Sequence, residues 1–150
     1  MTARRLTRTR SSRRPRQADL KRAVSTAYYA VFHELCRTVA DLMIGTSGSD
    51  RSLPAWRQAY RSVDHSFAKS QCRKRTVMAK FPKDIEDFGN LFVDLQDDRH
   101  RADYDPAAIF TLSDVEGAID AAEDAIRGFR KTSVKDRRAF AAWATMKTRN

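Results

Sequence analysis

Residues 20–42 read LKRAVSTAYYAVFHELCRTVADL, and this stretch decides the fold class. Its apolar residues recur at steps of three and four, the spacing that places side chains on one face of an α-helix. The members of this face are Leu20, Val24, Ala27, Tyr28, Val31, Leu35, Val39 and Leu42. We therefore expect one long core helix that ends before the glycine- and serine-rich residues 45–50.

The same helix has a second, half-apolar face. At 100° per residue, Tyr29, His33, Cys36 and Ala40 gather on the side opposite the main stripe. A helix that is apolar on two sides is either central in a bundle or shared between two subunits. Both interpretations stay open from the pattern alone.

The rest of the chain predicts further helices. Pro54 is placed to open a helix, and residues 64–81 are expected to form one or two short ones. A strong apolar stripe follows Pro82, at Ile85, Phe88, Leu91, Phe92 and Leu95. Ser113 to Glu116 has a capping-box pattern, and a last helix is expected from about Ser133. Strict alternation is missing throughout, so the predicted fold is an all-α, antiparallel four- to five-helix bundle.

Length and composition limit the class of protein. The chain has 150 residues, the size of one domain, and no apolar run of 18 or more. Without such a run or an apolar leader, we expect a soluble, cytoplasmic protein rather than a membrane or secreted one. Cys36 and Cys72 have no metal-ligand spacing around them, so we expect reduced thiols, no metal site and no cofactor.

The net charge of +10 is concentrated at the two ends of the chain. Residues 1–18 carry seven arginines and no acid, a charge of +7. Residues 19–126 carry 14 Lys or Arg against 18 Asp or Glu, a charge of −4, and residues 127–150 carry eight against one, a charge of +7. We divide the chain into a basic disordered arm (1–17), a helical bundle (18–130) and a basic C-terminal helix or tail (131–150).

Basic ends are typical of contacts with nucleic acid, because each cation placed on a phosphate releases condensed counterions. A solvated tail explains the arm equally well from charge alone, and an organellar transit peptide ranks third. The candidate nucleic-acid-binding residues are Arg4, Arg5, Arg8, Arg10, Arg13, Arg14, Arg16, Arg73, Lys74, Arg75, Arg137 and Arg138.

Two short elements together carry a resemblance. AYYAVFH at residues 27–33 and DDRHRADYDP at residues 97–106 occur in this order. On these elements, roughly residues 18–130 resemble the HEPN superfamily, the helical "higher eukaryotes and prokaryotes nucleotide-binding" domains. The resemblance implies an all-α bundle of four or five helices and commonly a homodimer. It also implies one of three roles: RNA-cleaving toxin, partner of a nucleotidyltransferase-like antitoxin, or non-catalytic RNA- and nucleotide-binding module.

Catalytic members of that superfamily carry an Arg and a His that are separated by four to six intervening residues. The cation offsets phosphate charge while the imidazole moves a proton. This chain lacks the spacing: Arg61 precedes His65 by a gap of three, and Arg99 is followed by Asp103 and Tyr104. Arg99, Asp103 and Tyr104 remain the catalytic candidates. The competing structural interpretation pairs Arg99 with Asp103 or Asp105 to fix the turn before the next helix.

Three functions follow, of which we expect the first. The first is a homodimeric HEPN-like module that binds RNA or another polyanion without catalysis. The second is a divergent metal-independent endoribonuclease. The third is a toxin-antitoxin component whose ligand is a nucleotidyltransferase-like partner protein.

Overall fold

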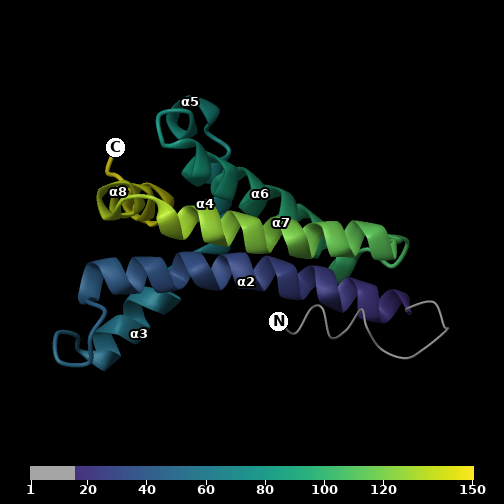
Figure 1. The fold of residues 1–150 in the computed structure, drawn as a ribbon, viewed down its shortest axis with the longest axis horizontal. Helices are drawn as coiled ribbons and strands as arrows, with labels where there is room; N and C mark the ends of the chain where they lie inside the picture. The colour runs from purple at the N-terminus through teal and green to yellow at the C-terminus, as the bar shows by residue number, and fades with distance from the viewer. Residues whose placement is uncertain (1–15) are drawn as a thin grey trace.

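The computed structural model describes residues 16–150, and within that range the chain forms seven α-helices and no strand. The all-α prediction is therefore confirmed. The helices are α2 (Gln17–Ile44), α3 (Leu53–Arg61), α4 (His65–Cys72), α5 (Arg75–Met78), α6 (Lys83–Tyr104), α7 (Leu112–Lys131) and α8 (Val134–Thr145) (Figure 1).

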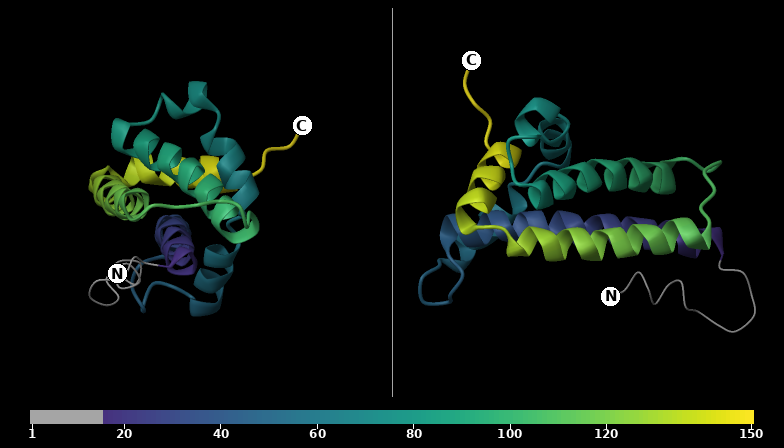
Figure 2. Two further views of the ribbon diagram at one scale, coloured as in Figure 1. Left: turned by 90° about the vertical axis from the view of Figure 1, so that its right-hand side faces the viewer. Right: turned by 45° about the horizontal axis from the view of Figure 1, so that its top comes forward.

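Three long helices form the body of the bundle. α2, α6 and α7 lie alongside one another, with α6 running opposite to the other two (Figures 1 and 2). Three short helices connect α2 to α6. Of these, α3 packs on α2, and α4 and α5 pack on α6. α8 crosses one end of the bundle and packs on α2 and α4.

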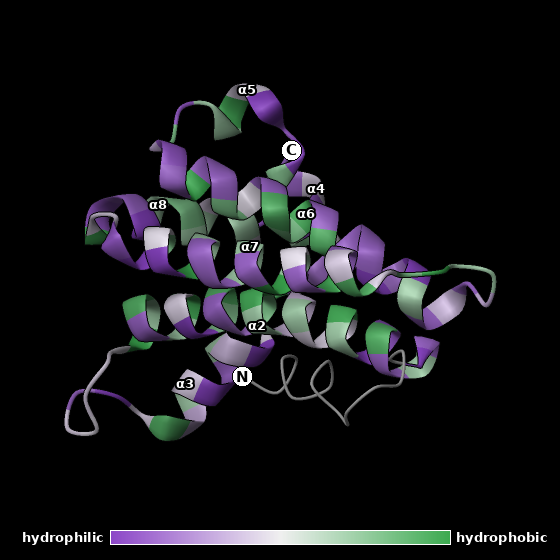
Figure 3. Ribbon diagram, turned by 45° about the vertical axis from the view of Figure 1, so that its right-hand side comes forward, coloured by the Kyte–Doolittle hydropathy of each residue, from purple (hydrophilic) through white to green (hydrophobic). Residues whose placement is uncertain are grey.

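The core fills the space between these helices. Hydrophilic residues dominate the outward side of α7 (Figure 3), whereas Val115, Ile119, Ala122 and Phe129 on its other side are buried. Phe88, Phe129 and Phe140 join α6, α7 and α8 in one cluster, with Phe88 and Phe129 stacked at a centroid distance of 4.2 Å. Burying each such ring contributes about 1.5–3 kcal/mol. α8 therefore shares the core of the long helices.

Local sequence explains where the helices begin and end. Gly45 follows α2 at a φ of 129°, a conformation that favours glycine. Ser52 and Ser133 cap α3 and α8 by accepting hydrogen bonds from backbone N–H groups. The expected capping box at Ser113 is wrong in position, because Thr111 is the N-cap of α7 and pairs with Asp114.

Paired hydrogen bonds hold distant segments together. The side chain of Gln17 donates to the carbonyl of Phe110 at 2.8 Å and accepts from its N–H at 3.0 Å. The amide of Gln71 donates to the carbonyl of Trp143 at 2.9 Å, and the Trp143 indole donates back to the carbonyl of Gln71 at 3.1 Å. The first pair ties α2 to the loop before α7, and the second ties α4 to α8.

The second apolar face of α2 is partly covered within the chain, with Cys36 and Ala40 buried and His33 left exposed. α3 packs against it, and His33 is hydrogen-bonded to the hydroxyl of Tyr60 on α3. Cys36 and Cys72 are both free thiols, as expected, and burial raises the pKa of each to about 12. In residues 16–150, every helix is too short or too polar to cross a bilayer.

Candidate functional site

An open groove between α4 and the C-terminal half of α6 gathers basic side chains. Its volume is about 840 Å³. Five of the side chains that line it are cationic and one is a carboxylate, Asp97. The cations are Lys69, Arg73, Lys74, Arg99 and Arg101. The groove therefore has a formal charge of +4, in a segment of the chain whose overall charge is negative.

Ion pairs offset part of this charge, because Arg99 pairs with Asp103 and Arg101 lies 3.6 Å from Asp98, two carboxylates that do not line the groove. Asp97 pairs with Lys69 and lies 3.8 Å from Arg73, so one carboxylate is shared by two cations. Lys74 donates to the neutral side chain of Gln71 at 2.7 Å and lies over the Trp143 ring. Exposed ion pairs such as these contribute little to stability, whereas a cluster of cations raises the local concentration of anions.

Arg99 is the most constrained cation of the groove. Its Nε donates to Asp103 at 3.0 Å, and the other carboxylate oxygen of Asp103 accepts from the Ser25 hydroxyl at 2.7 Å. Its guanidinium also lies over the rings of Tyr28 and Tyr29, at 5.7 and 5.4 Å from their centroids. The side chain keeps 19% of its surface exposed. In residues 16–150, Asp103 is the one carboxylate that forms an ion pair with Arg99, and it accepts the hydrogen bond from Nε of the guanidinium.

The Arg99–Asp103 pair forms as the sequence suggests, but its location differs. α6 continues to Tyr104, so the pair lies in the last turns of that helix rather than in the following turn. Through Ser25 it ties α6 to α2. Lys21 of α2 adds a contact with the carbonyl of Asp105 at 3.2 Å.

His65 meets Tyr28 beside Arg99. Nδ1 of His65 is hydrogen-bonded to the Tyr28 hydroxyl, and the imidazole stacks on Phe32 with the ring centroids 3.7 Å apart. Burial and the positive charge of Arg99 lower the pKa of His65, although Asp64 opposes the shift. For Tyr28, burial raises the pKa of the phenol, and the positive charge of Arg99 opposes this shift. At neutral pH the imidazole is therefore uncharged and the phenol protonated.

This arrangement has a definite chemical capability. In the tautomer whose Nδ1–H donates to Tyr28, Nε2 of His65 carries a lone pair that can accept a proton. Arg99 supplies a fixed positive charge for a phosphate nearby. A cation and a neutral base thus come together from α6 and α4, without the linear Arg-to-His spacing.

No family model, curated protein or solved structure matches this chain. The site is therefore interpreted from its own geometry. In residues 16–150, His, Cys, Asp and Glu side chains form no group of three or more that could hold a metal ion.

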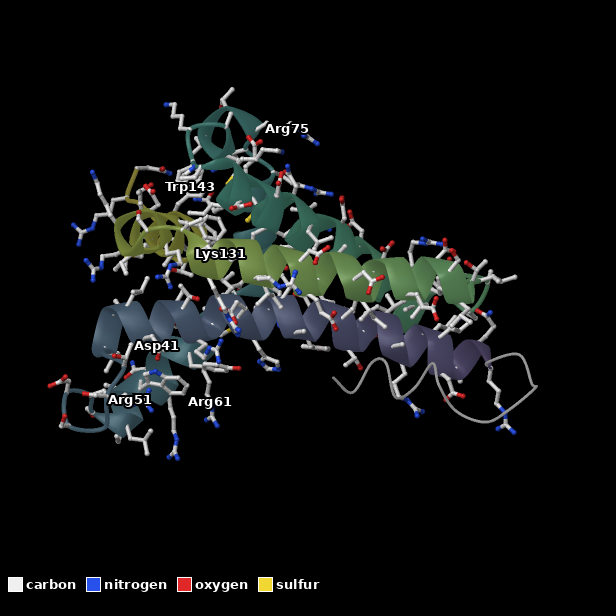
Figure 4. The ribbon with its side chains drawn as sticks, viewed as in Figure 1. Asp41, Arg51, Arg61, Arg75, Lys131 and Trp143 are labelled. Atoms are coloured by element: carbon white, nitrogen blue, oxygen red, sulfur yellow. The ribbon has the colours of Figure 1, made fainter. Side chains whose placement is uncertain are left out.

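The other candidate residues lie in several places. Tyr104 is 65% exposed, and its ring packs beside His100. Arg75 is exposed at the start of α5 (Figure 4), and Arg16 is exposed before α2. Arg137 and Arg138 are on α8 and do not line the groove. Six arginines of the arm fall outside the described residues: Arg4, Arg5, Arg8, Arg10, Arg13 and Arg14.

Sequence reasoning missed how much of this site comes from other helices. Tyr28, Tyr29 and Ser25 are on α2, and His65 follows the N-cap residue Asp64 of α4. The signal for His65 was weak, because a lone histidine in an irregular segment does not reveal its tertiary neighbour. Arg73 and Lys74 are candidates from the sequence, but only the fold brings them to the same groove as Arg99.

Proposed function

We propose that this protein is a HEPN-like module that binds RNA, or another polyanion with a phosphodiester backbone, in the groove between α4 and α6. The observation that carries the proposal is the gathering of five cations in a single open groove, where the carboxylates paired with them are three: Asp97, Asp98 and Asp103. Phosphate contacts supply most of the affinity in such binding, whatever the base sequence. Arg99 is already oriented by Asp103 and two tyrosines, so it loses little freedom when it binds a phosphate.

The groove is tested by removing equal charge from two places. Arg73→Gln with Lys74→Gln removes two groove cations, whereas Lys83→Gln with Arg127→Gln removes two exposed cations elsewhere. The probe is a fluorescent 20-nucleotide oligouridylate, titrated at several salt concentrations with the full-length chain. We expect the groove variant to bind more weakly and to lower the salt slope by about 2, one unit for each lost phosphate contact. Equal weakening by both pairs would show that the groove has no special role.

Ribonuclease activity is a second candidate, favoured by the meeting of His65, Tyr28 and Arg99. Nε2 of His65 would accept the proton of the RNA 2′-hydroxyl as its oxygen bonds to the adjacent phosphorus, while Arg99 would offset charge on that phosphate. The P–O5′ bond would break, the 5′-oxygen would take a proton from the imidazolium or from water, and a 2′,3′-cyclic phosphate would remain. The same oligouridylate, incubated without metal and run on a denaturing gel, reports cleavage directly. Cleavage that persists in folded His65→Ala and Arg99→Ala variants would remove this candidate.

A further inference from the structure

A row of aromatic rings lies along the seam where α2 and α3 meet. Tyr29 and His33 of α2 continue into Tyr60 and Trp56 of α3. Successive ring centroids are 6.1, 5.9 and 5.3 Å apart. We call these four side chains the aromatic row. Asp41 and Arg51 lie at its Trp56 end, and Arg61 is at the end of α3 (Figure 4).

The rings of this row are held in place but not buried. His33 is exposed, and Tyr29, Trp56 and Tyr60 are each half-buried. Trp56 donates its indole N–H to Asp41 at 2.9 Å, and the Tyr60 hydroxyl is hydrogen-bonded to His33. Ala59 and Val63 supply the buried contacts of this region. The row is thus a preorganised surface of partly exposed rings, with little freedom to lose on binding.

The charge around the row is positive. Arg51 lies 4.8 Å from the Trp56 ring at one end, and Arg99 lies 5.4 Å from the Tyr29 ring at the other. α3 contains Arg57 and Arg61, both exposed, and no acidic residue. Asp41 is already engaged by Trp56 and Arg51. The surface therefore suits a ligand that has both flat rings and negative charge.

The aromatic row and the basic groove share Arg99, and this indicates which class of ligand could contact both. Arg99 is both a wall of the groove and the cation over Tyr29, so one strand can follow phosphate contacts from the groove to the row. Aromatic rings beside a basic groove are how proteins bind single strands, because every unpaired base offers a π-face for stacking. A duplex keeps those faces inside its own stack.

We propose that the aromatic row stacks with unpaired bases, so that the protein prefers single-stranded nucleic acid over a duplex. This inference rests on the proposed function, since it assumes that the groove holds the phosphates of the same strand. It adds the strandedness of the ligand and a second surface, formed by α2 and α3, that a phosphate-binding groove alone does not require.

The two tryptophans of the chain allow a direct test. In a Trp143→Phe chain, Trp56 is the only indole, and in a Trp56→Phe chain, Trp143 is the only one. The probes are a 12-nucleotide oligouridylate, a 12-base-pair RNA duplex and inorganic polyphosphate, which has charge but no bases. We expect oligouridylate to quench Trp56 fluorescence at saturation, with little effect from polyphosphate. Trp143 lies under Lys74 at the groove, so its fluorescence should respond alike to both probes.

Ring removal tests the same surface by affinity. Tyr60→Ala and the exposed His33→Ala should each weaken oligouridylate binding about fivefold or more, while polyphosphate binding stays unchanged. Tyr60→Phe keeps the ring and should retain most of the affinity. If Tyr60→Ala does not fold, His33→Ala still tests the contribution of a ring. Thermal melts followed by circular dichroism show whether each variant is folded.

The outcomes separate the two proposals. Failure of polyphosphate and oligouridylate to bind at all would overturn the proposed function. Two outcomes would overturn only the proposal that the aromatic row stacks with bases. One is binding of polyphosphate while oligouridylate leaves Trp56 fluorescence unquenched, and the other is equal affinity for oligouridylate and duplex. Equal loss of polyphosphate and oligouridylate binding in His33→Ala would also overturn it, because the ring would then act on phosphate contacts rather than on bases.

Discussion

Glu34 shows how a single charged residue is accommodated in the core side of α2. Its side chain is 6% exposed, yet its carboxylate accepts two hydrogen bonds from Arg130 of α7, at 2.9 and 2.8 Å. Arg37, one turn along α2, donates a third at 2.7 Å. A buried carboxylate is tolerated when its oxygens are paired in this way. The two-point contact with Arg130 also fixes α7 against α2.

Replacing Arg130 should therefore destabilise the protein more than its exposure suggests. In Arg130→Ala, Glu34 stays buried with Arg37 still donating to its carboxylate, and we expect a loss of about 2 kcal/mol in the free energy of unfolding. Arg127→Ala is the matched control, since it breaks an exposed pair with Asp124 worth less than about 1 kcal/mol. Urea denaturation at pH 7 measures both. Equal losses would mean that Arg130 acts as an ordinary surface cation.

At the same scale, the sequence predicts some partners well and others not at all. Arg99 and Asp103 are four residues apart on one helix, so their pairing follows from helical geometry. His65 and Tyr28 are 37 positions apart, and Glu34 and Arg130 are 96 apart. Contacts of that kind depend on how the helices pack, which a residue pattern does not specify.

At the scale of helices, apolar periodicity predicted the long helices, whereas neighbouring capping residues made the first residue of α7 harder to predict. The stripes of α2 and α6 are long enough to identify both helices. At the start of α7, Thr111 with Asp114 and Ser113 with Glu116 are rival capping boxes. Gln17 holds the backbone of Phe110 from both sides, which places Thr111 at the helix start. The predicted N-cap, Ser113, is therefore two residues too late, and a contact from another helix accompanies the true boundary.

Two glycines within α7 offer a paired test of helix packing. A Cβ at Gly117 would meet nothing within 4 Å, whereas a Cβ at Gly128 would lie 3.0 Å from a carboxylate oxygen of Asp84 on α6. Gly117→Ala should raise the free energy of unfolding by about 0.5–1 kcal/mol through helix propensity alone. Gly128→Ala should gain less, or lose stability, because Asp84 must move. Thermal and urea unfolding compare the two. A larger gain at Gly128 would show that α6 and α7 are less closely packed there.

At the scale of the whole molecule, the long helices share one core, whereas α3 is attached to this core chiefly through α2. α2 packs against α3, α6, α7 and α8, so most residues of its central turns are buried. α3 packs chiefly on α2, and its one buried residue is Ala59. The aromatic row is at this attachment of α3 to α2, whereas the groove is built on the longer helix α6. The two surfaces proposed for one ligand thus differ in how firmly the fold supports them.

This difference predicts the order in which helices open. Amide hydrogen exchange reports local unfolding, which is easiest where few buried apolar contacts must be broken. We expect residues 53–61 of α3 to exchange much faster than residues 23–40 of α2, which opens only with the whole bundle. Mass spectrometry of peptic fragments after timed exchange measures both segments in one sample. Equal protection of α3 and α2 would show that α3 unfolds only with the core, and that the aromatic row is as rigid as the groove.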